Sequence, residues 1–352
     1  MSGLTAIGAQ PATSAYALFD WARELVTPAL RDAVRAMPPP ECRIVGYHRG
    51  WHEADGGPPA APVGERGGKA VRPALAFLSA RAVGGAAEAA VPAAVVVELV
   101  HDFSLLHDDV IDGDPLRRHR PAAWTVYGTP AAVLTGDALL VNAVRTLAES
   151  SAPRTEPALR ELITALVDLM RGQSQDVAFE KATMVAPAEY LSMAEGKTGA
   201  LMGCACALGG VLAGASEDRV SGLRDFGRCL GVAFQCVDDL LGIWGSSARS
   251  GKPVGADLAA RKKSLPVVVA LADEGPVGRR LADLYAGSAP LPEADVALAA
   301  RLIEEAGGRE RTELEAKRQV AAAMRALARA EPAPEIYRQL HDIAVLMTGR
   351  DR

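Results

Sequence analysis

Residues Ala93–Asp112 read AAVVVELVHDFSLLHDDVID. Apolar residues recur here at intervals of three and four, which places them on one face of an α-helix. The end of the stretch carries three acidic residues, Asp108, Asp109 and Asp112. The stretch therefore predicts a buried helix whose last turn concentrates negative charge.

The same helical spacing recurs along most of the 352 residues, for example in YALFDWARELVTPALRDAVRAM and ALRELITALVDLMRGQSQDVAFE. Alternation with a period of two, which is typical of strands, is scarce. The hydrophobic share of 49% is enough for a large core. We predict an all-α fold with a flexible tail over residues 1–14 and a single domain over residues 15–350.

Composition argues against several classes of protein. The net charge of −5 makes a general nucleic-acid binder a poor match, because such proteins are more often basic. The five cysteines are scattered without zinc-type spacing, as expected for reduced thiols in a cytoplasmic protein. The N-terminal residues lack the pattern of a signal peptide.

One uncharged run, TGALMGCACALGGVLAGAS at Thr198–Ser216, approaches the length of a membrane span. Glycine, alanine and serine dominate it, and small residues also allow buried helices to pack closely. We predict a core helix here and no membrane span.

The acidic cluster is a candidate magnesium site. Asp108 and Asp112 are four residues apart and share one helix face, where like charges destabilise the helix unless a cation neutralises them. Mg²⁺ takes oxygen ligands and needs only one or two carboxylates when a phosphate is also bound. The alternative is a solvated acidic helix end.

A second acidic pair, Asp238 and Asp239, lies in the apolar stretch VAFQCVDDLLGIWG. An ionised pair in such a setting is costly unless it lines a polar cleft or binds a cation. If the two helices face each other, they form a cavity walled by carboxylates.

Cationic and hydrogen-bonding residues are clustered near glycines and helix starts. Arg117 and Arg118 follow the first acidic cluster, and Lys69 and Arg72 precede a helix that we expect to begin at Pro73. The arginine fork suits phosphate oxygens. Each of these residues taken singly has a simpler interpretation as a solvated side chain or a core histidine. The further candidates are His101, Lys197, Thr198, Lys252 and Lys262.

Taken together, these motifs resemble those of the trans-type polyprenyl (isoprenyl) diphosphate synthase family over roughly residues 15–350. The first DDxxD motif of that family corresponds to Asp108–Asp112. The matching elements are GGK…RP at Gly67–Pro73, the arginine pair at Arg117 and Arg118, GD at Gly136 and Asp137, GQ at Gly172 and Gln173, KTG at Lys197–Gly199, FQ at Phe234 and Gln235, GK at Lys252, and the segment Lys262–Pro266.

The resemblance implies an isoprenoid-synthase-type helical bundle around a deep central cavity, present as a homodimer. It implies a short-chain enzyme of the geranylgeranyl or farnesyl diphosphate synthase type, with about three Mg²⁺ per active site. Its substrates would be isopentenyl diphosphate and an allylic diphosphate. The allylic C–O bond would ionise, the isopentenyl double bond would attack, and a proton would leave.

The resemblance also implies a role for each site residue. The metal-binding set is Asp108, Asp112 and Asp238, with Asp109 and Asp239 beside them. The allylic diphosphate would be held by Arg117, Lys197, Thr198, Gln235, Lys252 and Lys262. Isopentenyl diphosphate would be held by Lys69, Arg72, His101 and Arg118.

Three features depart from the family pattern. Gly242 replaces the last aspartate of the second motif, so metal affinity is expected to be weaker, or the helix ends there. His119 stands where the family often has glycine, and the insert Gly46–Gly68 has no readable purpose. Two alternatives stay open: a class I terpene cyclase, which shares the first acidic motif and the fold, and a non-catalytic regulatory subunit or scaffold of the same fold, which only Gly242 supports.

Product length is predicted from the residues that precede the first motif. Ser104 and Phe103 lie four and five residues before Asp108, about 6–7.5 Å away by helical rise. Ser104 leaves space and Phe103 would form a floor. By resemblance this favours a geranylgeranyl (twenty-carbon) product first and a farnesyl (fifteen-carbon) product second. The alternative is that Phe103 only packs in the core.

Overall fold

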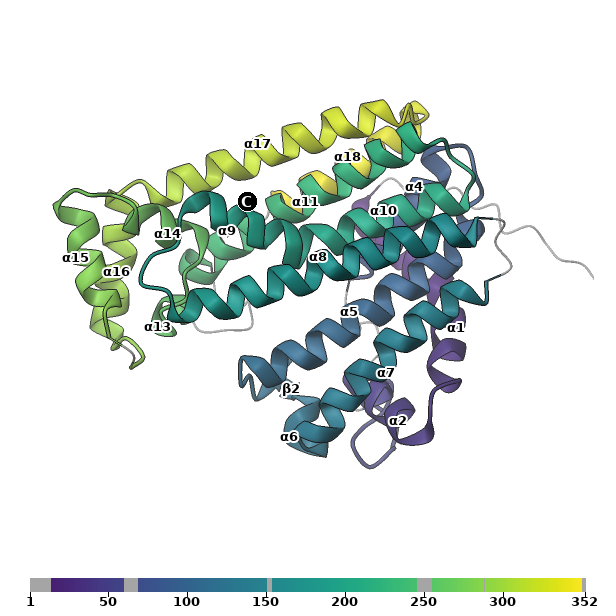
Figure 1. The fold of residues 1–352 in the computed structure, drawn as a ribbon, viewed down its shortest axis with the longest axis horizontal. Helices are drawn as coiled ribbons and strands as arrows, with labels where there is room; N and C mark the ends of the chain where they lie inside the picture. The colour runs from purple at the N-terminus through teal and green to yellow at the C-terminus, as the bar shows by residue number, and fades with distance from the viewer. Residues whose placement is uncertain (1–13, 60–68, 151–153, 246–254, 288, 350–352) are drawn as a thin grey trace, which may run out of the picture.

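The computed structural model describes residues 14–59, 69–150, 154–245, 255–287 and 289–349. Its regular structure is almost entirely helical, as predicted (Figure 1). Its elements are α1 (Ala15–Arg35), α2 (Pro39–His48), α4 (Val71–Ala82), η1 (Ala87–Ala90), α5 (Val91–Ile111), β1 (Leu116–Arg117), β2 (Arg120–Pro121), α6 (Ala123–Tyr127), α7 (Thr129–Ala148), α8 (Thr155–Lys181), α9 (Pro187–Ala194), η2 (Glu195–Gly199), α10 (Ala200–Leu212), α11 (Glu217–Trp244), α13 (Ala256–Ala259), α14 (Leu265–Leu271), α15 (Pro276–Tyr285), α16 (Glu293–Glu305), α17 (Gly308–Arg329) and α18 (Pro334–Thr348).

The predicted tail falls outside the described residues except for Ser14. This residue caps α1, because its hydroxyl oxygen accepts a hydrogen bond from the backbone N–H of Ala17 at 3.3 Å. The boundary of the single domain stays a prediction.

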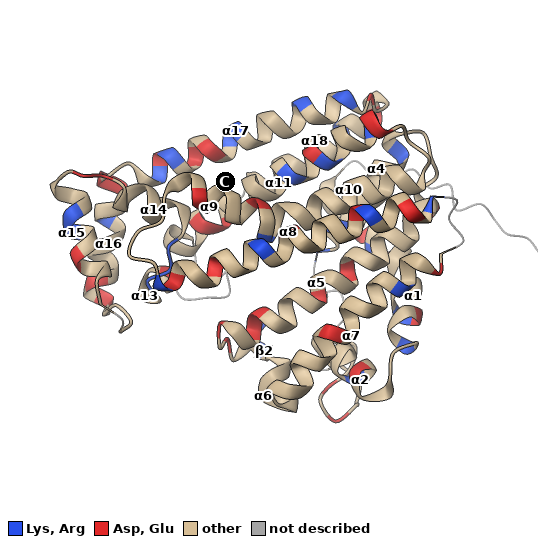
Figure 2. Cartoon of the chain, in the orientation of Figure 1, with Lys and Arg blue, Asp and Glu red and all other residues tan. Residues whose placement is uncertain are grey.

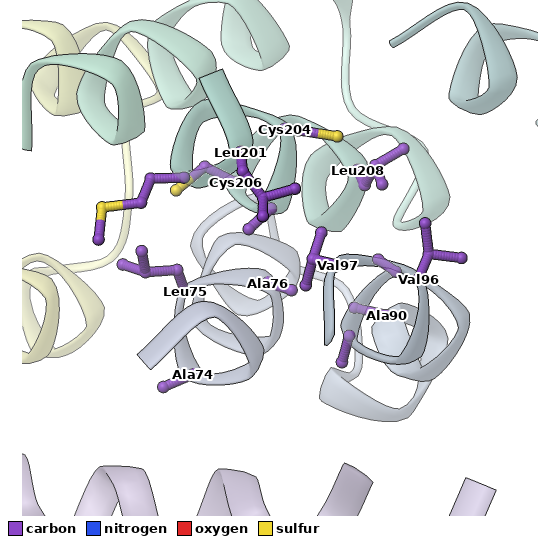
Figure 3. Packing of buried hydrophobic residues seen from close by; sticks show 14 of the residues in the cluster. Ala74, Leu75, Ala76, Ala90, Val96, Val97, Leu201, Cys204, Cys206 and Leu208 are labelled. Atoms are coloured by element: carbon purple, nitrogen blue, oxygen red, sulfur yellow. The ribbon is translucent and has the colours of Figure 1, made fainter. Parts of the chain in front are cut away.

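Helix α10 is the centre of the core. Every residue of Ala200–Leu212 is buried, and the helix packs against α4, α5, α8 and α11. Figure 3 shows Leu201, Cys206 and Leu208 meeting side chains of α4 and α5. A side chain at Gly209 would lie 2.2 Å from the carbonyl oxygen of Ala76, so the small residue permits close helix packing. The prediction of a core helix in this run is confirmed.

Two helical stretches are long and apolar enough to cross a membrane by length and composition. They are Ala87–Ile111 and Thr129–Ala148. The first has 61% of its apolar window buried and packs on α4, α7 and α10, as a core helix of a soluble protein would. The second has 39% of its window buried. The predicted absence of a membrane span stays a prediction.

Two predicted helix boundaries are wrong. Helix α4 begins at Val71, so Pro73 is its third residue and not its first. Gly242 does not end α11, which continues to Trp244. One glycine costs a helix only about 1 kcal/mol, and the packing of α11 on α10 and α17 outweighs that cost.

The described part of the insert braces the β1–β2 hairpin. Arg120 donates hydrogen bonds to the carbonyl oxygen of Tyr47 at 2.9 Å and to the carboxylate of Glu53 at 2.8 Å. The hydroxyl of Tyr47 donates to the carbonyl oxygen of Pro121 at 2.8 Å. The insert therefore has a structural purpose that its sequence did not reveal. Its residues 60–68 lie outside the described chain.

Candidate active site

The acidic end of α5 lies beside a lysine from η2. The amino group of Lys197 is 4.0 Å from Asp108 and 2.6 Å from Asp176, a residue of α8 that the sequence analysis missed. A side chain at Gly172 would lie 2.2 Å from the backbone nitrogen of Lys197, so this glycine lets η2 approach α8. Residues 195–199 form a π-helical turn, a feature that is frequent at functional sites.

Asp108 is partly buried, and Asp112, the C-cap residue of α5, is exposed. Burial raises the pKa of Asp108 to about 6; nearby Lys197 opposes this rise and Asp112 adds to it. The ionised carboxylate is therefore held in an unfavourable setting. A cation bound at this place would relieve it.

Asp109 points about 100° away from Asp108 around α5. Its side chain is almost fully buried and accepts a hydrogen bond from Nε of Arg117 at 2.8 Å, with a second bond from the same guanidinium. This ion pair ties the hairpin to α5. The suggested roles of Asp109 at the metal and of Arg117 at a diphosphate stay predictions.

The hairpin turn that carries the arginine pair is backbone-strained. Arg118 has φ 51° and His119 has φ 62°, in the left-handed region where residues other than glycine pay about 1–2 kcal/mol each. Strained turns of this kind are often found at functional sites. The turn presents Arg118 beside the cationic pocket described below.

The second acidic segment likewise pairs a more exposed aspartate with a buried one. Asp238 is exposed, whereas Asp239 is buried and accepts hydrogen bonds from three groups. These donors are the Tyr190 hydroxyl at 2.5 Å, the Leu265 backbone N–H at 2.9 Å and the Gln235 amide at 3.0 Å. Burial raises the pKa of Asp239 to about 6, although the hydrogen bonds counteract the rise. Asp239 therefore fixes α11 against α9 and α14, and its role as a metal ligand stays a prediction.

The two acidic segments meet around one site. The Thr198 hydroxyl donates to Gln235 at 2.8 Å, and this links η2 to the second segment. Burial alone would lower the pKa of Lys262, but a set of surrounding carboxylates outweighs it and raises that pKa above its ordinary value. These carboxylates are Asp257, Asp176, Asp239 and Asp112. Figure 2 shows acidic residues at the end of α5 near β2 and again near α9.

The donor set fits magnesium bound together with a diphosphate. Among the described residues, no three His, Cys, Asp or Glu side chains converge closely enough to hold a metal ion on their own. Mg²⁺ does not need such a cage, because it keeps waters and takes ligands from substrate phosphates. The assignment of Asp108, Asp112 and Asp238 as its ligands stays a prediction.

A second, cationic region surrounds His101, which lies about two helical turns before Asp108 on α5. The electrostatic neighbours of His101 are Arg72, Arg118, Arg49 and His48. Burial, reinforced by these arginines, lowers the pKa values of His101 and His48 well below the ordinary range, so both rings are neutral at pH 7. The buried Nε of Arg72 has no hydrogen-bond partner within the described residues. A small pocket lined by His48, Arg117, Arg118 and Arg120 lies alongside. This chemistry suits an anion.

The cationic region contains an ion-pair cluster that the sequence analysis did not find. Arg49 donates to the carboxylate of Asp102, which is 1% exposed, and to that of Glu98 at 2.9 Å. Glu98 and Asp102 are four residues apart on α5, and this spacing was the available signal. Arg49 follows α2 in a segment whose purpose was unreadable.

The remaining predicted residues are placed as follows. Lys69 is exposed just before α4. Phe103 is buried in the core, with its ring edge-on to His107 at a centroid distance of 4.8 Å. The Ser104 hydroxyl donates to the His101 carbonyl oxygen at 2.8 Å. Lys252 lies outside the described residues.

Comparisons of the sequence and of the structure with known proteins identify the family of this chain. The model of the polyprenyl synthetase family matches residues 59–303. The (2E,6E)-farnesyl diphosphate synthase of Mycobacterium tuberculosis is 44% identical over 332 residues, 94% of this chain and 91% of that protein. The geranylgeranyl diphosphate synthase of the same organism is 43% identical over 334 residues, 94% and 93% of the two chains. The crystal structure of a polyprenyl synthetase from Streptomyces coelicolor has a TM-score of 0.90 and 45% identity, and it covers 95% of this chain and 99% of its own. This chain belongs to the polyprenyl synthetase family.

Proposed function

We propose that the chain is a prenyltransferase that joins isopentenyl diphosphate head-to-tail to an allylic diphosphate, giving a short-chain polyprenyl diphosphate. The observation that carries this proposal is the meeting of two acidic segments beside a separate cationic region, which provides two distinct places for anionic groups. A cyclase would have one diphosphate to hold and would leave the second region without a task.

In the allylic half of the site, negative charge develops on the diphosphate as it leaves. Mg²⁺ held by Asp108, Asp112 and Asp238 would supply stabilisation of that charge when bound. Lys197 lies beside Asp108, and Thr198 with Gln235 provides polar groups along the same wall. We assign the remaining diphosphate contacts to Arg117, Lys252 and Lys262. Fixed donors placed before the reaction stabilise developing charge without reorganisation.

The isopentenyl half holds a diphosphate that does not leave. Arg72 and Arg118 supply charge, and neutral His101 has one ring N–H to donate. We assign Lys69, which precedes α4, to the same diphosphate. Because these groups come from α4, α5 and the hairpin, they hold the second substrate on a rigid frame.

Incubation with isopentenyl diphosphate, an allylic primer and Mg²⁺ tests the proposal. We expect release of diphosphate together with chain extension. A hydrocarbon product would identify a cyclase instead. Absence of any product, with the protein folded and the primer varied, would support a non-catalytic scaffold.

The product is expected to be geranylgeranyl diphosphate first and farnesyl diphosphate second, with Phe103 setting the length. Phe103→Ala should lengthen the product, because it removes the floor below Ser104. Chromatography of the dephosphorylated alcohols measures the change. Phe19→Ala is the matched control, since Phe19 is equally buried in α1 at 3% exposure. An unchanged length in Phe103→Ala would assign Phe103 to core packing only.

We also propose a cytoplasmic homodimer formed through α7 and α8, which pack side by side. Their exposed apolar side chains recur at helical spacing: Leu134, Val141, Ile163, Val167 and Met170. Val141→Glu combined with Val167→Glu should convert the dimer to monomer in light scattering. Leu314→Glu on α17 is the control, because Leu314 is similarly exposed at 65%. A wild-type monomer, or a dimer that survives the double change, would contradict the proposal.

A further inference from the structure

A side chain at position 242 would collide with the carboxylate of Asp257 as that carboxylate is placed in the structure. A Cβ atom added to Gly242 would lie 2.0 Å from Oδ2 of Asp257 and 2.9 Å from its Cγ. Carbon and oxygen atoms that are not bonded stay more than 3 Å apart, so the carboxylate of Asp257 fills the space that a residue 242 side chain would use. The glycine and the aspartate therefore form a complementary pair.

Asp257 comes from a different element than Asp238. It lies in the short helix α13, which packs against α11 and α16. Its backbone carbonyl oxygen accepts a hydrogen bond from the Lys262 backbone N–H at 2.8 Å, which holds the turn after α13 in place. Asp257 reaches α11 at the level of Gly242.

Asp238 and Gly242 are four residues apart on α11 and so lie on one face, with about 5–6 Å between neighbouring Cβ positions. The carboxylate of Asp257 consequently lies about one helical turn from Asp238, and Asp257 acts electrostatically on Lys262 together with Asp239 of α11. Two carboxylates are thus present on this face although α11 itself provides only one of them there.

We infer that Asp257 supplies from α13 the acidic group that position 242 does not carry, and that it supports divalent-cation and diphosphate binding beside Asp238. The inference rests on the proposed function and deepens it. It replaces the expectation that Gly242 weakens the metal site, since the charge is kept and only its origin in the chain has moved.

A purely structural role for Asp257 makes a different prediction. Asp257 is the leading opposite charge around buried Lys262. If neutralising Lys262 were its only task, Asp257→Asn would lower thermal stability but would not weaken the binding of metal and diphosphate, because it would leave Lys262 freer to pair with phosphate. Binding measured without turnover therefore separates the two roles.

The test uses calorimetric titration of the full chain with Mg²⁺ and inorganic diphosphate, together with thermal unfolding. Asp257→Asn should weaken binding by about 10- to 100-fold, the usual effect of losing a supporting group at a metal site. Gly242→Asp alone should lower stability, because two carboxylates would compete for one space. Asp283→Asn, a change at an exposed residue of α15, should leave binding unchanged.

The decisive variant exchanges the two residues, Gly242→Asp with Asp257→Gly. It should restore binding to within a few fold of wild type. Wild-type affinity in Asp257→Asn would overturn the inference, and so would failure of a folded exchange variant to recover. If the proposed function itself were wrong, wild type would neither bind Mg²⁺ with diphosphate nor form product, which is a distinguishable result.

Discussion

Replacing Asp108 by asparagine should lower kcat by about a thousandfold and should also stabilise the metal-free protein. Activity falls because asparagine cannot provide the negative charge that holds Mg²⁺ and, through it, the leaving diphosphate. Stability rises because burial raises the pKa of Asp108 to about 6, which means that the ionised form is disfavoured in the folded chain. The gain should be up to about 3 kcal/mol in the free energy of unfolding.

The sign of the pH dependence follows from the same shift. The folded-state pKa of Asp108 lies above its unfolded value, so the cost is fully present above pH 6 and disappears as the pH falls toward 4. The difference in melting temperature between Asp108→Asn and wild type should therefore be largest at neutral pH and shrink on acidification, measured in chelator.

Asp283→Asn is the control for charge removal, because Asp283 is exposed and should show little change at any pH. A variant at Asp108 that is less stable than wild type at pH 7 would contradict the idea that this carboxylate is held at a cost for function. Stabilising a protein by removing an active-site charge is a known form of the trade-off between stability and activity.

The parts of the fold that could be predicted are those written in local patterns. The helical face and acidic end of α5, and the small residues of α10, are legible because periodicity and composition act over a few turns. The two acidic pairs could be recognised for the same reason, because each lies within a short stretch of sequence. Which aspartate of each pair is buried was harder to predict. Adjacent residues such as Asp108 and Asp109 point about 100° apart, and the residues around them decide which one is buried.

Contacts between distant segments could not be predicted. Asp176 meets Lys197 from another helix, and Tyr190 meets Asp239 across 49 positions in the chain. The clearest case is Gly242, whose missing carboxylate looked like a loss at the level of the motif. The space is taken by Asp257, 15 residues further on by number, and no spacing rule connects a glycine with an acid on another helix.

The same limit applies to Arg49, and the ion pair that it makes is expected to have a large effect on stability. Arg49→Met should lower the free energy of unfolding by about 3–5 kcal/mol, because it leaves the carboxylate of Asp102 buried without its main cation. Chemical denaturation measures the loss. Arg329→Met is the matched control: its partner Asp225 is exposed, and such pairs contribute about 0–1 kcal/mol.

The double variant Arg49→Met with Asp102→Leu decides whether the cost comes from an abandoned charge. Replacing both members of a buried pair by apolar side chains removes the uncompensated carboxylate, so the double variant should be more stable than Arg49→Met alone. Lower pH should also relieve Arg49→Met, since Asp102 then takes up a proton. A double variant as unstable as the sum of its single changes would show that the two side chains act independently.

Arg49 also lies near His101 and Arg118, so the same double variant tests it for a part in binding. Rescue of folding without rescue of isopentenyl diphosphate affinity would assign Arg49 a part in binding as well as in folding.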